Sequence, residues 1–99
     1  MVNVAEYELA DDVVWVGTLP GLVCRGAEQV RNRLAQVPTF SPEVLAERDG
    51  MVLIDPHVSA PPRLNPELHQ ILVVDDGIVS EIRDYPNLAA AQAAWEATA

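Results

Sequence analysis

The sequence predicts an α+β fold in which an antiparallel β-sheet packs against helices. Strand patterns dominate the second half of the 99-residue chain, where Asp49-Gly50 and Asp75-Asp76-Gly77 are tight-turn signals between apolar runs. Helical patterns lie on either side of this region, at residues 26–37 and 88–97. Strands that follow one another in hairpins favour antiparallel pairing, and the length suits one domain covering residues 1–99.

The first 25 residues contain one clear strand. Residues 2–9 mix apolar and acidic side chains without a clean period, which predicts a short helix or a loop. Ala10-Asp11-Asp12 indicates a turn before a buried strand at residues 13–16. Residues 17–21 read as a loop, and residues 22–24 as a short strand.

The helix at residues 26–37 has an apolar stripe at helical spacing. It consists of Ala27, Val30, Leu34 and Val37. Arg31 and Arg33 are expected to point to solvent. Pro38 ends the helix, because the residue before a proline avoids helical backbone angles.

Residues 41–58 permit two interpretations. Ser41-Pro42-Glu43 is typical of a helix start. Asp49-Gly50 instead favours a hairpin with strands at residues 44–48 and 51–58. We favour the hairpin, and we expect the proline-rich residues 59–66 to form a loop.

The C-terminal third predicts a second hairpin followed by a helix. Its strands are residues 69–74 and 78–85, and Pro86-Asn87 ends the sheet and caps the helix at residues 88–97. The apolar stripe of this helix is Leu88, Ala91 and Trp95.

Composition excludes several classes of function. The net charge is −9, whereas binding to nucleic acid or to an anionic membrane needs clustered cations. Cys24 is the single cysteine, so no internal disulfide can form. The sequence has no apolar run of about 18 residues and no basic-then-apolar leader, which predicts a cytoplasmic protein. No cofactor is expected.

Three stretches carry a family resemblance: Ala10-Asp11-Asp12-Val13-Val14-Trp15, Cys24-Arg25-Gly26, and residues 69–88. In these the chain resembles the SnoaL-like branch of the NTF2-like superfamily. The resemblance implies a strongly curved antiparallel sheet wrapped around helices into a cone, with a hydrophobic pocket at the open end. Family members normally carry a long helix before the first of these stretches, and only nine residues precede Ala10 here. We therefore expect that helix to be missing or shortened, unless the true start lies upstream of Met1, and we expect a homodimer that covers the apolar surface left behind.

The resemblance also suggests an acid/base group. In limonene-epoxide-hydrolase-like members an Arg-Asp-Tyr at the end of the last strand places its Asp in the pocket, and Arg83-Asp84-Tyr85 matches it. The Tyr and Asn that hold the water in that enzyme correspond to Trp15 and Gly17. Its Arg-x-Asp corresponds to Asp55-Pro56-His57. In ketosteroid-isomerase-like members the general base falls at Gly17, and the second acid falls near His69.

The candidate catalytic residues are therefore Asp84, His69 and His57. Asp84 could orient either histidine as a general acid/base pair. Alternatively, both histidines lie at the pocket rim or surface, and Asp84 bonds Arg83 or a backbone amide. The candidate ligand-binding residues are Trp15, Asp55, Ile82 and Tyr85. We expect no metal site, since Asp55, His57 and His69 form no compact ligand motif.

Three functional hypotheses follow. The first is binding of a small apolar molecule in the pocket. The second is an acid/base enzyme, such as a cyclase, an isomerase or an epoxide hydrolase, that uses Asp84 with His57 or His69. The third is a non-catalytic dimerisation or interaction module. Fold alone does not choose among them, because one fold hosts many functions.

Overall fold

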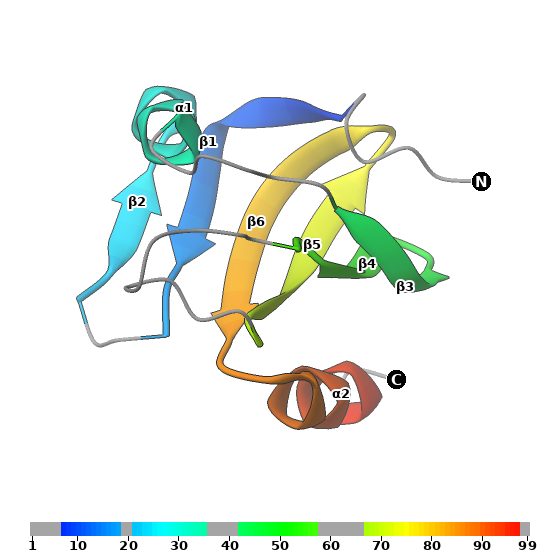
Figure 1. The fold of residues 1–99 in the computed structure, drawn as a ribbon. Coiled ribbons are helices and arrows are strands. Elements are labelled where there is room, and N and C mark those ends of the chain that lie inside the picture. Colours follow the sequence, from blue (N-terminus) through cyan, green and yellow to red (C-terminus); the bar gives the residue numbers. More distant parts are fainter. Residues whose placement is uncertain (1–6, 19–20, 36–41, 58–66, 98–99) are drawn as a thin grey trace.

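The computed structural model describes residues 7–18, 21–35, 42–57 and 67–97. In these residues a curved six-stranded sheet is accompanied by two helices (Figure 1). The elements in chain order are β1 (Glu8–Val16), β2 (Val23–Arg25), α1 (Ala27–Ala35), β3 (Glu43–Arg48), β4 (Met51–Asp55), β5 (His69–Asp75), β6 (Ile78–Tyr85) and α2 (Leu88–Ala97). The strand order across the sheet is β2-β1-β6-β5-β4-β3.

The sheet is mixed. Four strands, from β3 to β6, pair antiparallel in sequence order, and β1 pairs antiparallel with β2. β1 runs parallel to β6, with Trp15 opposite Ile82. No tight turn joins β1 to β6, so nothing local forces these two strands to be antiparallel. The predicted α+β class with a curved sheet is confirmed, and the parallel pair is a feature that the hairpin signals do not predict.

β1 begins earlier than predicted. The strand covers Glu8–Val16, so the expected turn at residues 10–12 is wrong, and so is the helix or loop expected at residues 8–9. The register against β6 shifts between Leu9 and Val14, so the acidic pair Asp11-Asp12 lies in an irregular bulge. Such a bulge keeps polar residues outside while the strand continues. Residues 2–6 lie outside the described part of the chain.

Both predicted hairpins are confirmed. Asp76 and Gly77 have φ angles of 54° and 79°, the positive values that a two-residue type I′ turn requires. In the first hairpin Glu43 begins a strand, which rules out the alternative helix start at that residue. Strand β4 ends at Asp55, whereas the predicted strand reached residue 58.

Each face of the sheet packs against one helix. On the inner face, Val13, Trp15, Ile54 and Leu72 form one core cluster with Ala27 and Val30 of α1. On the outer face, Leu53 and Ile71 form a second cluster with Ala91 and Trp95 of α2. This division follows from side chains that alternate between faces along each strand.

Helix α1 is anchored by Val30, which is completely buried. Residues 36 and 37 of the predicted helix lie outside the described residues. The expectation that Arg33 points to solvent is wrong, because its guanidinium lies 4.7 Å from the centroid of the Trp15 ring. A guanidinium over the face of an aromatic ring is attracted to the electron density of the ring, which accounts for this position.

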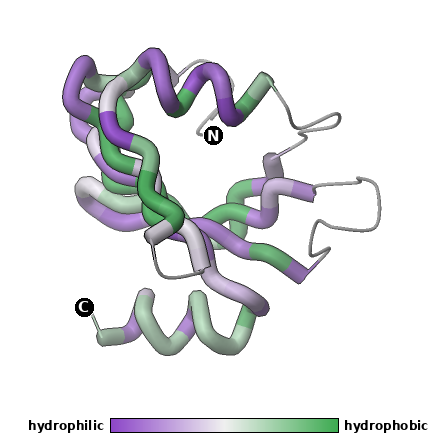
Figure 2. Tube along the Cα trace, turned by 90° about the vertical axis from the view of Figure 1, so that its left-hand side faces the viewer, coloured by the Kyte–Doolittle hydropathy of each residue, from purple (hydrophilic) through white to green (hydrophobic). Residues whose placement is uncertain are grey.

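Helix α2 is fixed at both ends. At its start the Asn87 side-chain oxygen accepts the Ala90 N–H at 2.8 Å, as an N-cap does. Near its end, Arg48 from β3 lies 4.1 Å from the Trp95 ring and donates to the Trp95 carbonyl at 3.0 Å. Figure 2 shows pale green or green over most of this alanine-rich helix. Neither described helix is long and apolar enough to cross a membrane.

Candidate functional site

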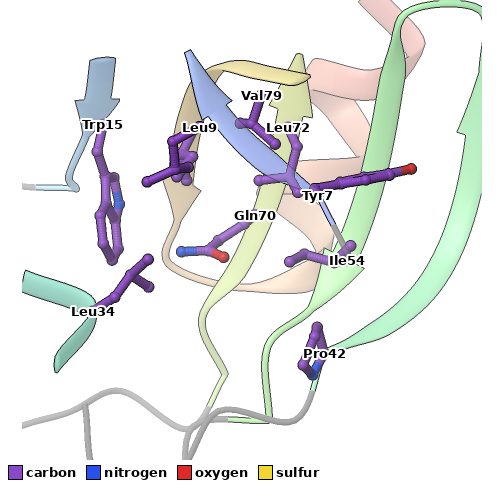
Figure 3. Close-up of a pocket in the computed structure, with 10 residues that line it drawn as sticks. Tyr7, Leu9, Trp15, Leu34, Pro42, Ile54, Gln70, Leu72 and Val79 are labelled. Carbon is purple, nitrogen blue, oxygen red and sulfur yellow. The ribbon is translucent and has the colours of Figure 1, made fainter. Parts of the chain in front are cut away.

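A cavity of about 330 Å³ lies on the inner face of the sheet (Figure 3). Its described lining is largely apolar and comes from β1, α1, β4, β5 and β6, together with the residues just before β1 and β3. It consists of Tyr7, Leu9, Trp15, Leu34, Pro42, Ile54, Gln70, Leu72, Val79 and Ile82. The volume falls at the lower end of the range for small-molecule pockets.

A carboxylate lies behind two of these lining residues. One oxygen of Asp84, Oδ1, accepts the indole N–H of Trp15 and the amide N–H of Gln70, both at 2.8 Å. Gln70 stands directly opposite Asp84 in the β5–β6 pair, so both side chains project from the same face. Trp15 reaches the same carboxylate because β1 runs alongside β6. Asp84 itself is not among the residues that line the cavity.

Burial shifts the titration of this carboxyl. It raises the pKa of Asp84 above its ordinary value of 3.8, because desolvation disfavours the ionised form. Hydrogen bonds from Gln70 and Trp15, and the positive charge of Arg33, act in the opposite direction without cancelling the effect of burial. Asp84 therefore keeps its proton to a higher pH than an exposed aspartate.

Gly17 shows why the isomerase-type base is absent. Its N–H donates to the Leu22 carbonyl at 2.7 Å in the connection from β1 to β2. A Cβ built on Gly17 would lie 2.9 Å from the Leu22 Cβ, closer than real Cβ atoms come. Any side chain here would displace this connection, so packing accounts for the glycine.

The two histidines lie away from Asp84. His69 is 8% exposed, and its Nδ1–H donates to the Glu67 carbonyl at 2.6 Å. Its Nε2 lies 3.6 Å from Asp55 Oδ2, and the exposed His57 approaches the same oxygen at 3.7 Å. The structure thus brings both histidines to Asp55 and neither to Asp84. The reason is the alternation along β5, which places His69 and Gln70 on opposite faces.

The predicted ligand-binding residues fall into two groups, one at the cavity and one away from it. Trp15 and Ile82 line the cavity, and Asp84 bonds two lining residues. Tyr85 packs against the outer-face cluster with α2, and Asp55 pairs with the histidines. Among the described residues, no group of three or more His, Cys, Asp or Glu side chains could hold a metal ion.

Sequence reasoning missed Gln70. It is 4% exposed and belongs to a strand that is otherwise apolar from Ile71 to Val74. Two features of the sequence could have identified it. Gln70 lies two residues before Leu72, on the same face of the strand, and the register of the hairpin puts it opposite Asp84. A buried polar side chain within an apolar strand is more informative than an exposed one.

Comparison with known proteins identifies the fold. No family model and no curated protein matches the sequence. Solved structures do match, among them a protein from Mesorhizobium loti described as a SnoaL-like polyketide cyclase. It is 20% identical, with 83% of this chain and 80% of that chain covered and a TM-score of 0.58.

Two further solved structures are similar. An NTF2-like protein of unknown function from Burkholderia xenovorans is 15% identical and has a TM-score of 0.61. The match covers 83% of this chain and 65% of that chain. An M. tuberculosis epoxide hydrolase of the limonene-epoxide-hydrolase-like type is 18% identical and has a TM-score of 0.53. The match covers 84% of this chain and 64% of that chain. The sheet, the inner cavity and these likenesses together establish that the chain has the fold shared by NTF2-like and SnoaL-like proteins.

Proposed function

We propose that the protein binds a small, largely apolar molecule in the cavity between α1 and the sheet. The observation that carries the proposal is the composition of the described lining, in which largely apolar side chains surround the amide of Gln70. Small-molecule sites typically combine such walls with a few placed polar groups. Gln70 is held in place by Asp84, whose carboxylate also fixes the Trp15 ring.

A titration with apolar probes tests this proposal. Trp15 lines the cavity, so the NMR signal of its indole N–H should shift when toluene or cyclohexanol enters. The Trp95 indole, in the outer-face cluster, should not move. Leu72→Phe adds bulk to the lining and should weaken binding, whereas Leu45→Phe, at a residue 39% exposed on β3, should leave it unchanged. If no probe shifts the Trp15 signal, the cavity does not bind ligands of this class.

A second candidate function is acid/base catalysis, and the state of Asp84 favours it. Its pKa is raised by burial, and groups with perturbed pKa values occur often at active sites. Both described hydrogen bonds go to Oδ1, which leaves Oδ2 as the atom that gains or loses a proton. With neither histidine near it, the carboxyl would act without the His partner considered from the sequence.

Asp84→Asn separates the two functions. An asparagine can keep an oxygen toward Trp15 and Gln70, but it cannot transfer a proton at neutral pH. If the protein only binds, the variant should retain affinity for apolar probes. If Asp84 is an acid/base group, turnover of a responsive epoxide or cyclisation substrate should fall by about 10²–10⁴-fold while binding persists.

The homodimer expected from the resemblance remains part of the proposal. Light scattering at several concentrations tests it, and a monomer throughout would contradict it. An interaction module would be favoured if side chains such as Tyr85 filled the cavity. Tyr85 instead packs on the outer face and does not line the cavity, so this hypothesis finds less support.

A further inference from the structure

The orientation of the Gln70 amide is fixed by chemistry. Asp84 Oδ1 accepts N–H groups from both Trp15 and Gln70. An ionised carboxylate can only accept hydrogen bonds, so the amide nitrogen of Gln70 faces an ionised Asp84. The same orientation is kept in a protonated Asp84 when the proton is on Oδ2, the oxygen that accepts from neither Trp15 nor Gln70. Figure 3 accordingly shows the Gln70 nitrogen on the Trp15 side and its oxygen turned away.

The Gln70 oxygen, Oε1, is open to the cavity. It accepts no hydrogen bond from any described residue. It is also not sealed in the protein, since no fully buried side-chain nitrogen or oxygen in the described part of the chain lacks a partner. Gln70 as a whole is only 4% exposed and lines the cavity, so the remaining access to Oε1 is from the cavity side.

The other polar groups of the described lining are turned elsewhere. The Trp15 indole N–H is bonded to Asp84. The Tyr7 ring lines the cavity, but its hydroxyl end points away from Gln70 (Figure 3). Burial and the nearby charge of Glu47 raise the pKa of Tyr7, so this hydroxyl stays neutral. Among the side chains of the described lining, Gln70 Oε1 is thus the hydrogen-bonding atom left free next to the apolar walls, and it is an acceptor.

We propose that the cavity selects apolar molecules that carry a hydroxyl group, and that this hydroxyl donates to Gln70 Oε1. The inference rests on the proposed binding function and specifies its ligand class. A ketone or epoxide of equal size offers only an acceptor, so its oxygen would face the Gln70 oxygen without a proton between them. Leaving a buried acceptor without a donor reduces the free energy of binding. The site therefore distinguishes ligands by whether they carry a hydrogen-bond donor rather than by their shape.

Cyclohexanol and cyclohexanone form a matched pair of probes, with the same number of heavy atoms and nearly the same shape. Dissociation constants come from NMR titration of the Trp15 indole signal. The alcohol should bind about five- to tenfold more tightly than the ketone, the ratio expected for one hydrogen bond. In the wild-type protein, bound alcohol should also shift the side-chain amide protons of Gln70, and the ketone should not.

Gln70→Leu removes the acceptor and should bring the alcohol-to-ketone ratio close to one. Gln92→Leu, at an exposed position on α2, is the matched control and should keep the ratio. The inference is overturned if both probes bind wild type equally, if the ketone binds more tightly, or if the preference survives in Gln70→Leu. Should that variant fail to fold, the Gln70 amide shifts in wild type still decide the question. If neither probe nor toluene binds, the proposed function itself fails.

Discussion

Replacing Asp84 by alanine should be one of the most damaging single changes available on β6. The carboxylate is the shared acceptor for two N–H donors on residues that are each 4% exposed, Trp15 and Gln70. Asp84→Ala leaves both donors without a partner. Each unsatisfied buried donor costs about 1–3 kcal/mol, and water entering from the adjacent cavity reduces that cost. We therefore expect the free energy of unfolding to fall by about 2–4 kcal/mol.

Urea unfolding followed by circular dichroism measures this loss. For a urea m-value of about 1–2 kcal/mol/M, the midpoint should fall by about 1–4 M. Asp84→Asn, which retains an acceptor oxygen, should change the free energy by less than about 1 kcal/mol.

The matched control removes another carboxylate from the same strand. Glu81 receives two hydrogen bonds from Arg83 at 2.9 and 3.1 Å, but the pair lies at the surface. Glu81→Ala should therefore cost about 0–1 kcal/mol. If Asp84→Ala is no more destabilising than Glu81→Ala, the carboxylate is not what holds Trp15 and Gln70 in place.

Three further predictions concern pH and the second helix. Because the native pKa of Asp84 is raised, the folded state holds its proton to a higher pH than the unfolded chain does. The contribution of Asp84 to the free energy of unfolding should therefore fall as pH rises from below 3.8 through the native pKa. Asp84→Asn should remove this part of the pH dependence when urea unfolding is measured at several pH values. Arg48→Met should lower the free energy of unfolding by about 1–2 kcal/mol through loss of its contacts with Trp95, and a thermal melt that is unchanged would contradict this. Asn87→Ala should cost about 1 kcal/mol by removing the cap of α2, whereas Asn87→Asp should retain most of the stability in the same melt.

Local signals in the sequence were sufficient for most of the architecture. The Asp-Gly turns located both hairpins, because positive φ angles favour glycine at such turns. The apolar stripes located both helices. Asp11-Asp12 misled the prediction for the opposite reason: acidic residues indicate exposure, and a bulge within a strand exposes them as well as a turn does.

The candidate site was less predictable, because it depends on which strands meet. Alternation along the strands puts Asp84 on one face with Ile82, and His69 on the same face as Ile71, but it does not say which face of the sheet is concave. The contact between Trp15 and Asp84 requires the parallel pairing of β1 with β6, for which no local pattern exists. The prediction for Arg33 was wrong because a charged residue on a helix is normally expected to face solvent. Its contact with the Trp15 ring depends on how the helix packs on the sheet, which the sequence pattern does not show.

The junction between β1 and β6 has a consequence for the order of folding. Trp15 and Asp84 are 69 positions apart, so their contact closes nearly the whole chain. Contacts of such long range form at a high entropic cost and tend to form late, after the local hairpins. During synthesis the walls of the cavity therefore cannot be complete until β6 has emerged. A ligand that occupies the finished cavity would stabilise the contacts that form last, and it should slow unfolding more than it speeds folding.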